Sequence, residues 1–123
     1  MTSSDRPPVP GFERRVLPRT PVERAVRVQV AGRPVFMAMT ANVSRGGFFV
    51  KMRDPPPVGT RVKFVLDLGQ RAIRGHADAA WIRLRSSLDE GPRGMGLRII
   101  FLLDDGARHF EQFVAEAEAQ TGR

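Results

Sequence analysis

The stretch TANVSRGGFFV, residues 40–50, decides how the rest of the chain is interpreted. Paired glycines directly before an apolar run are typical of a turn between two strands. A plain hairpin would need only its turn residues, whereas this one also carries an amide, a hydroxyl and a guanidinium at Asn42, Ser44 and Arg45. The stretch therefore predicts a hairpin with a cluster of polar side chains that the turn itself does not require.

Segments on both sides of this hairpin show the two-residue alternation of β-strands. The predicted strands cover residues 26–30, 35–39, 61–68, 72–84 and 95–101. Turns or loops are expected between them at 31–34, 54–59 and 86–93. Regularly spaced antiparallel strands of this kind predict an all-β fold, a small barrel.

The alternation also assigns side chains to faces of the strands. In the strand over 35–39, one face carries Val35, Met37 and Met39. In the last strand, the side chains expected to share a face are Met95, Leu97, Ile99 and Phe101.

The C-terminal segment changes to helical spacing. A helix is predicted over 105–119, with Asp104 as its N-cap and Gly122 after its end. Its apolar stripe is expected to pack on the strands and consists of Ala107, Phe110, Phe113, Val114 and Ala117.

The length and composition indicate one domain. Residues 1–13 are Pro-rich and without periodicity, so they are predicted to form a flexible tail before a single domain over 14–120. The absence of cysteine excludes disulfides, thiolate zinc sites and cysteine nucleophiles. No apolar run approaches the roughly 20 residues needed to cross a bilayer, and the N-terminus has no signal-peptide core. A cytoplasmic protein with no membrane insertion is therefore expected.

Signals for catalysis or a metal are poor. His76 lies in a predicted strand and His109 in the predicted helix, and neither has a second ligand near it in sequence. Ser44 has no histidine base nearby, and the glycines of GMGLR (94–98) precede a strand rather than the helix of a dinucleotide-binding loop. The sequence thus predicts neither an enzyme nor a metal site.

The charge favours an anionic ligand without requiring one. The net charge is +7, and of the 20 basic residues all but Lys51 and Lys63 are arginines. The arginine guanidinium pairs with phosphate and with the O6/N7 edge of guanine. A GC-rich genome would raise the arginine content with no functional cause, so both interpretations stay open on charge alone.

Two motifs in order decide between them. Residues 15–19, RVLPR, form an RxxxR pattern, and residues 42–47, NVSRGG, form an [D/N]xSxxG pattern, with one predicted hairpin between them. Together with Trp81 and with a GxG before the last strand, these motifs resemble the PilZ domain family of bacterial receptors for cyclic di-GMP. The resemblance covers roughly residues 12–118. It implies a six-stranded antiparallel β-barrel with a C-terminal helix.

The resemblance also implies a ligand site with no catalytic residue. Its members would be Arg14, Arg15, Arg19, Asn42, Ser44, Arg45, Gly46 and Gly47, with Trp81, Gly94 and Gly96 as further contacts. Arginines suit the phosphates and the Hoogsteen edge of guanine, while Asn42 would accept from guanine N–H groups. Gly47 would keep the surface open to a base.

The family further implies two ligand molecules per chain, because an arginine directly before RxxxR, here Arg14, favours a stacked pair. No other cofactor is expected. Binding would order the N-terminal arginine segment and so present a changed surface to an unidentified downstream protein.

Three alternatives stay open. Asn42 and Ser44 could merely cap a turn, with the glycines supplying positive φ. The chain could be a PilZ-type scaffold that binds no nucleotide. A small basic barrel could also bind RNA or single-stranded DNA, although aromatic residues are only 7% of the chain and stacking surfaces need them.

Overall fold

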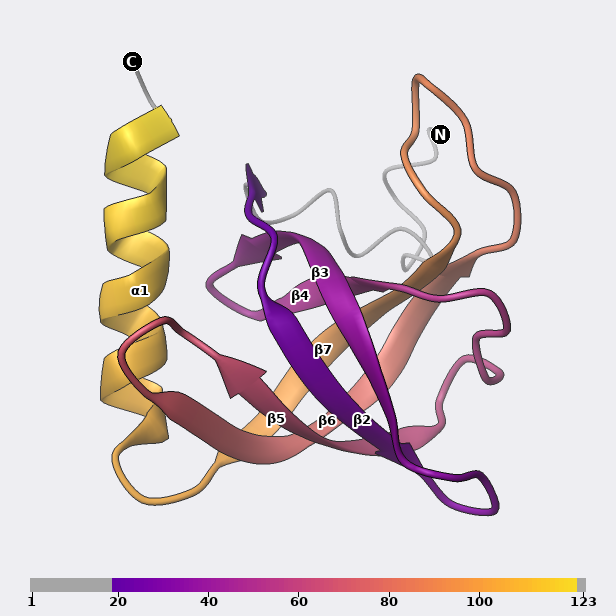
Figure 1. Cartoon of the computed structure of the whole chain (residues 1–123), viewed down its shortest axis with the longest axis horizontal. Helices are drawn as coiled ribbons and strands as arrows, with labels where there is room; N and C mark the ends of the chain where they lie inside the picture. The colour runs from indigo at the N-terminus through magenta and orange to yellow at the C-terminus, as the bar shows by residue number, and fades with distance from the viewer. Residues whose placement is uncertain (1–18, 122–123) are drawn as a thin grey trace, which may run out of the picture.

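The computed structural model describes residues 19–121, in which seven strands precede one helix (Figure 1). The strands are β1 (Thr20–Pro21), β2 (Ala25–Val30), β3 (Phe36–Ser44), β4 (Gly47–Lys51), β5 (Arg61–Asp67), β6 (Ala72–Arg83) and β7 (Gly94–Leu102). The helix is α1 (Gly106–Thr121), and it is not long and apolar enough to span a membrane.

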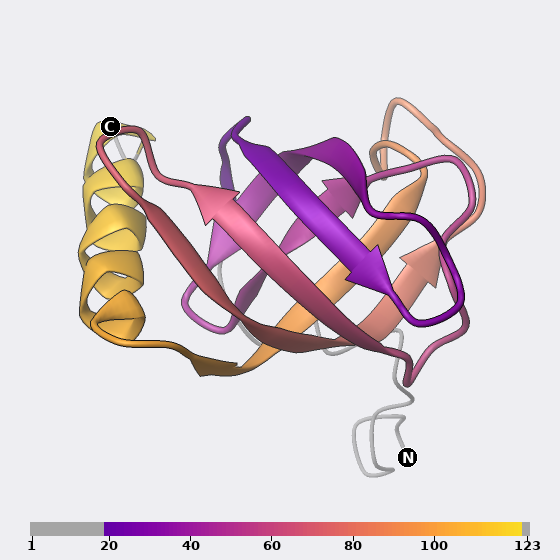
Figure 2. The ribbon, with the colours of Figure 1, turned by 60° about the horizontal axis from the view of Figure 1, so that its bottom comes forward.

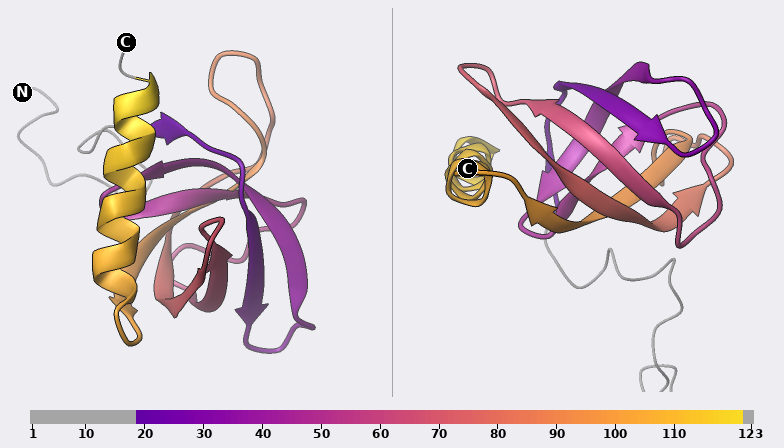
Figure 3. Two further views of the ribbon diagram at one scale, coloured as in Figure 1. Left: turned by 60° about the vertical axis from the view of Figure 1, so that its left-hand side comes forward. Right: turned by 90° about the horizontal axis from the view of Figure 1, so that it is seen from below.

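Six of the strands close into an antiparallel barrel. They are hydrogen-bonded in the order β3-β2-β5-β6-β7-β4, and a further pairing between β3 and β4 closes the ring. β1 lies outside this ring, paired with the end of β3. Figures 2 and 3 show the strands wrapped around one axis, with α1 standing beside the barrel. The predicted six-stranded barrel with a C-terminal helix is confirmed.

The core lies inside the ring and follows the alternation of the sequence. In β5, Val62, Phe64 and Leu66 are buried while Arg61 and Lys63 are exposed. The rings of Phe48 and Phe64 meet edge to face across the core, with centroids 5.0 Å apart. Burial of such side chains supplies the main stabilisation of a barrel of this size.

One predicted strand face is confirmed and another needs a correction. Val35, Met37 and Met39 are exposed together on the outer side, and Phe36 packs on the core. Phe101 does not continue the inner face of β7. A register shift between His76 and Ala77 leaves one extra residue in β7 and turns Phe101 outward, where its ring stacks on His76 with centroids 4.6 Å apart.

The start of the helix also differs from the prediction. Asp104 adopts a left-handed backbone with φ 53°, and the helix begins at Gly106, so the residue in the N-cap position is Asp105. Asp104 instead places its carboxylate 3.4 Å from Arg74. Of the predicted stripe, Phe110 and Val114 are buried and Phe113 packs partly on the core, but Ala107 is exposed. The predicted cap at Gly122 lies outside the described residues.

Candidate functional site

The pairing of four neighbouring strands places the polar hairpin and the tryptophan in one row. Asn42 of β3 is opposite Phe49 of β4, Phe49 is opposite Gly96 of β7, and Gly96 is opposite Trp81 of β6. Val43, the neighbour of Asn42, lies in the core, so alternation directs the Asn42 side chain to the outer face. Residues as far apart in sequence as Asn42 and Gly96 thus meet on one outer surface of the barrel.

A second row runs beside the first one. Ser44 is opposite Gly47, Gly47 is opposite Arg98, and Arg98 is opposite Asp78. The Asp78 carboxylate receives a hydrogen bond of 2.7 Å from Arg61 and lies 3.8 Å from Arg98. This row therefore presents a hydroxyl, a surface without side-chain bulk and a guanidinium that lies beside the Asp78 carboxylate.

The short strand β1 brings the first motif to the second. Pro21 pairs with Asn42 and Thr20 with Val43, which brings Arg19, the residue before Thr20, to the level of Ser44. Arg19 is the second arginine of the RxxxR pattern. The structure therefore brings together the end of one predicted motif and the centre of the other.

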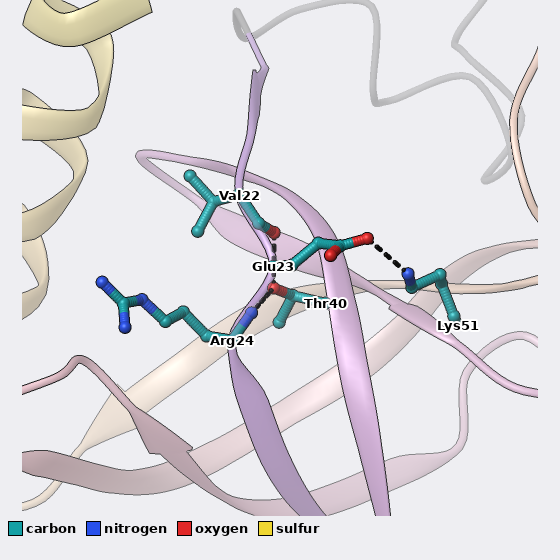
Figure 4. Close-up of polar contacts among 5 residues, drawn as sticks. All are labelled: Val22, Glu23, Arg24, Thr40 and Lys51. Atoms are coloured by element: carbon teal, nitrogen blue, oxygen red, sulfur yellow. Dashed lines mark hydrogen bonds and ion pairs between the residues drawn. The ribbon is translucent and has the colours of Figure 1, made fainter.

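Thr40 fixes the path by which the chain leaves β1 (Figure 4). Its buried hydroxyl donates to the carbonyl of Val22 at 2.7 Å and accepts from the amide of Arg24 at 2.9 Å. Its own amide donates to the carbonyl of Arg24 at 2.9 Å. Beside it, Lys51 donates to Glu23 at 2.8 Å, and this hydrogen bond and charge lower the pKa of the Glu23 carboxyl. These contacts anchor the segment that carries Arg19.

An aromatic and arginine cluster forms the middle of the site. The rings of Phe49 and Trp81 lie 5.0 Å apart, and the Arg83 guanidinium lies 4.9 Å and 5.0 Å from their respective centroids. Arg19 also lies over the Trp81 ring, 5.0 Å from its centroid. Arg83 is buried and donates to the carbonyl of Pro92 at 2.9 Å. Cations stacked on ring faces at this range are attracted to them.

Glycines make room for this cluster. A Cβ on Gly96 would collide with the indole of Trp81, and one on Gly94 would collide with the carbonyl of Val50 and the ring of Phe49. A Cβ on Gly47 would collide with the carbonyl of Leu97. The last glycine of the hairpin motif is thus needed for β4 to approach β7, and its predicted part in admitting a base stays a prediction.

The polar residues of the hairpin do not act as turn caps. Arg45 and Gly46 form the turn between β3 and β4, and neither Gly46 nor Gly47 has a positive φ. Within residues 19–121, the side chains of Asn42 and Ser44 make no hydrogen bond, although both are half-buried. The turn-capping alternative therefore does not explain why these two side chains are present.

The remaining predicted residues divide into two groups. Arg45 is exposed at the tip of the hairpin, while Arg14 and Arg15 lie outside the described residues. Sequence reasoning missed Arg83 and did not assign Phe49 to the site. Arg83 follows Trp81 by two residues, so the strand period would have placed it on the same face.

Neither histidine forms part of this site. His109 Nε2 lies 3.1 Å from Arg71 Nη1, and His76 stacks on Phe101. Across residues 19–121, no group of three or more His, Asp or Glu side chains is arranged to hold a metal ion.

Comparison with known proteins decides the family. A model of the PilZ domain matches residues 13–116. The chain belongs to the PilZ domain family. PilZ domains are a family of non-enzymatic receptors for cyclic di-GMP. A sequence search of curated proteins finds no significant match.

Solved structures share the fold of this PilZ domain. The inhibitor of motility MotI/DgrA from Bacillus subtilis aligns with a TM-score of 0.72 and 19% identity over 91% of this chain, which spans 55% of that protein. The PilZ domain of Escherichia coli YcgR, solved with c-di-GMP, aligns with a TM-score of 0.65 and 15% identity, over 88% of this chain and 94% of that domain. The PilZ domain of CeSA from a cellulose-synthesizing bacterium aligns with a TM-score of 0.57 and 25% identity, over 82% of this chain and 98% of that domain.

Proposed function

We propose that this PilZ domain binds cyclic di-GMP, without catalysis, on the outer face formed by the ends of β1, β3 and β4 and by β6 and β7. The observation that carries the proposal is the β1–β3 pairing, which brings Arg19 to the level of Ser44. The last residue of the first motif therefore lies beside the second motif, which supports a ligand shared by the two.

The chemistry of that surface suits a dianionic guanine nucleotide. Arg19 and Arg98 offer guanidinium groups for the phosphates and for guanine O6 and N7. Asn42 can accept from a guanine N–H group, and the Ser44 hydroxyl can donate to a phosphate oxygen. Because Asn is neutral, its contact is weaker than that of an aspartate at the same place.

Ring stacking adds to these polar contacts. Arg19 lies on the face of Trp81, and an arginine in this position can also stack on a guanine base. Arg14 and Arg15 would complete the set of cations from the N-terminal side, and Arg45 from the hairpin. With Arg14 present, the proposal is for two ligand molecules per chain.

The signal is proposed to pass by ordering of the arginine segment that precedes β1, which changes the surface next to Arg19 and so affects an unidentified partner protein. Thr40 and its contacts to residues 22–24 would provide the fixed point against which that segment closes.

The test is calorimetric titration with cyclic di-GMP, with GMP and a short RNA as control ligands. Arg15→Ala and Arg19→Ala each remove a charge-assisted contact worth roughly 1.5–3 kcal/mol, so binding should weaken by about tenfold or more. Ser44→Ala should weaken it less, and Asn42→Asp should bind at least as well as the parent chain. Arg108→Ala, on the exposed face of α1, is the matched control and should leave the affinity unchanged.

The alternative functions are outcomes of the same titration. Tight binding of RNA in preference to cyclic di-GMP would indicate a nucleic-acid-binding barrel. Absence of binding by every ligand would indicate a scaffold. Equal affinity of the parent chain and both arginine variants would refute the assignment of the site.

A further inference from the structure

The first half of β3 is an open strand edge. Residues 36–38 pair with β2 on one side, but the pairing of β3 with β4 ends at Met39 and Lys51. Figure 1 shows the start of β3 running beside β2 while β4 leads away from it. In an antiparallel pair, alternate residues direct their N–H and C=O groups away from the partner strand. Part of the backbone over 36–38 therefore faces away from β2, and no strand among residues 19–121 lies opposite it.

A cavity of about 430 Å³ lies along this edge, between the first half of β3 and residues 51–54. Phe36, Ala38 and Met52 line it, and all three are partly buried against the barrel core. The floor is therefore apolar and continuous with the core. It can accept an apolar side chain from outside.

The outer face of the same strand is also apolar. Val35, just before β3, and Met37 and Met39 within it are 51%, 62% and 40% exposed. Exposed apolar rows on an open edge favour association, and natural proteins usually protect such edges. Methionine adapts well to varied apolar partners.

The surroundings of the edge are basic. Arg27, Arg33 and Arg53 form no ion pair with any residue that the structure describes. Arg33 donates a hydrogen bond of 2.6 Å to the backbone carbonyl of Asp54 at the end of the cavity. The cavity lining holds one acidic residue, Asp54, against the three basic residues Arg33, Lys51 and Arg53. The charge complementary to this rim is negative.

We infer that this edge, which we call the β3 groove (residues 33–39 and 51–54), binds an extended acidic segment of a partner protein. The segment would pair with the backbone of β3, place an apolar side chain in the cavity and present carboxylates to Arg33 and Arg53. A second copy of this chain fits less well, because each copy carries a net charge of +7 and the same basic rim. The inference does not depend on the binding of cyclic di-GMP.

The probe is a blocked synthetic peptide in which Glu alternates with Val and Leu, titrated in the absence of nucleotide and followed by amide NMR shifts and calorimetry. Shifts should concentrate in residues 33–39 and 51–54. A peptide with Lys in place of Glu should bind at least about tenfold more weakly, a loss of about 1.4 kcal/mol. A peptide N-methylated on alternate residues should show a loss of the same size, because it cannot complete the backbone hydrogen bonds.

Two variants have matched controls. Arg53→Glu should weaken binding of the acidic peptide about tenfold, whereas Arg108→Glu on α1 should not change it. Met37→Asn should weaken it as well, whereas Leu88→Asn, at a side chain that is 104% exposed in a loop, should not. No peptide binding, equal binding of the Glu and Lys peptides, or no effect of Arg53→Glu would overturn the inference. The inference would also be overturned if sedimentation showed a dimer of the parent chain that Met37→Asn abolishes. The groove would then be occupied by a second copy.

Discussion

At the scale of single residues, the missing side chain of Gly96 decides whether Trp81 can lie against β7. Gly96→Ala forces an added methyl group into the indole ring, and overpacking of this kind costs typically about 1–3 kcal/mol. The loss should nearly vanish in a Trp81→Ala background, where the ring is gone. A double-mutant cycle of urea unfolding measures the coupling. Additive losses would contradict the proposed contact.

The buried hydroxyl of Thr40 holds the β1–β2 connection through two hydrogen bonds. Thr40→Val keeps the shape but leaves the Val22 carbonyl and the Arg24 amide without their buried partner, which should lower the free energy of unfolding by about 1–3 kcal/mol. Thr60→Val is the control, since the Thr60 hydroxyl bonds the Pro57 carbonyl at an exposed position. Chemical denaturation of both variants should show the larger loss at Thr40. The reverse order would mean that Thr40 does not anchor the β1–β2 connection.

At the scale of elements, the ion pair between β4 and the β1–β2 connection makes stability depend on pH. Lys51 holds the pKa of Glu23 below its ordinary value of 4.5. Since the folded-state pKa is depressed, the stabilisation is fully present above the unfolded-state value and is lost as the pH falls through the folded-state value. In Lys51→Met, this part of the acid dependence should disappear. Unfolding free energies measured across the acid range, with the Glu23 carboxyl followed by NMR, check it. An unchanged profile in the variant would exclude the pair as its source.

The strands were predictable because most of them keep a strict two-residue period. Prediction failed where that period is interrupted. The extra residue in β7 reverses the direction of Phe101, and a bulge between Thr40 and Asn42 shifts the pairing of β3. A strand of two residues such as β1 is too short to show an alternating pattern in the sequence. The turn before α1 was misassigned because Asp104 and Asp105 are equally good caps by residue type.

Part of the geometry of the candidate site was also predictable from the sequence. Motif spacing placed Asn42, Ser44 and Gly47 correctly on one hairpin. Their proximity to Arg19 depends on β1, whose pairing is a long-range contact that no local pattern encodes. Arg83 was missed because an arginine in a strand resembles any solvated residue until its ring contacts are known.

At the scale of the whole molecule, the proposed ligand number can be tested directly. Two stacked cyclic di-GMP molecules carry four phosphate charges, and in the proposal Arg14 would supply the additional cation for the second molecule. Saturation should occur at two ligands per chain, and Arg14→Leu should reduce this to one while Arg15 and Arg19 retain binding. Calorimetry at protein concentrations well above the dissociation constant gives the ratio. A ratio near one in both proteins would refute the role of Arg14.

The position of Trp81 has a practical consequence for the whole chain. It is the single tryptophan, it is 5% exposed, and Arg19 covers its face. All indole fluorescence of this protein therefore originates at the junction of the two motifs. Any event that moves Arg19, or that sets a guanine against the ring, should change the emission without a label and within the mixing time of a stopped-flow experiment. The molecule thus carries an intrinsic optical reporter placed at its own candidate site.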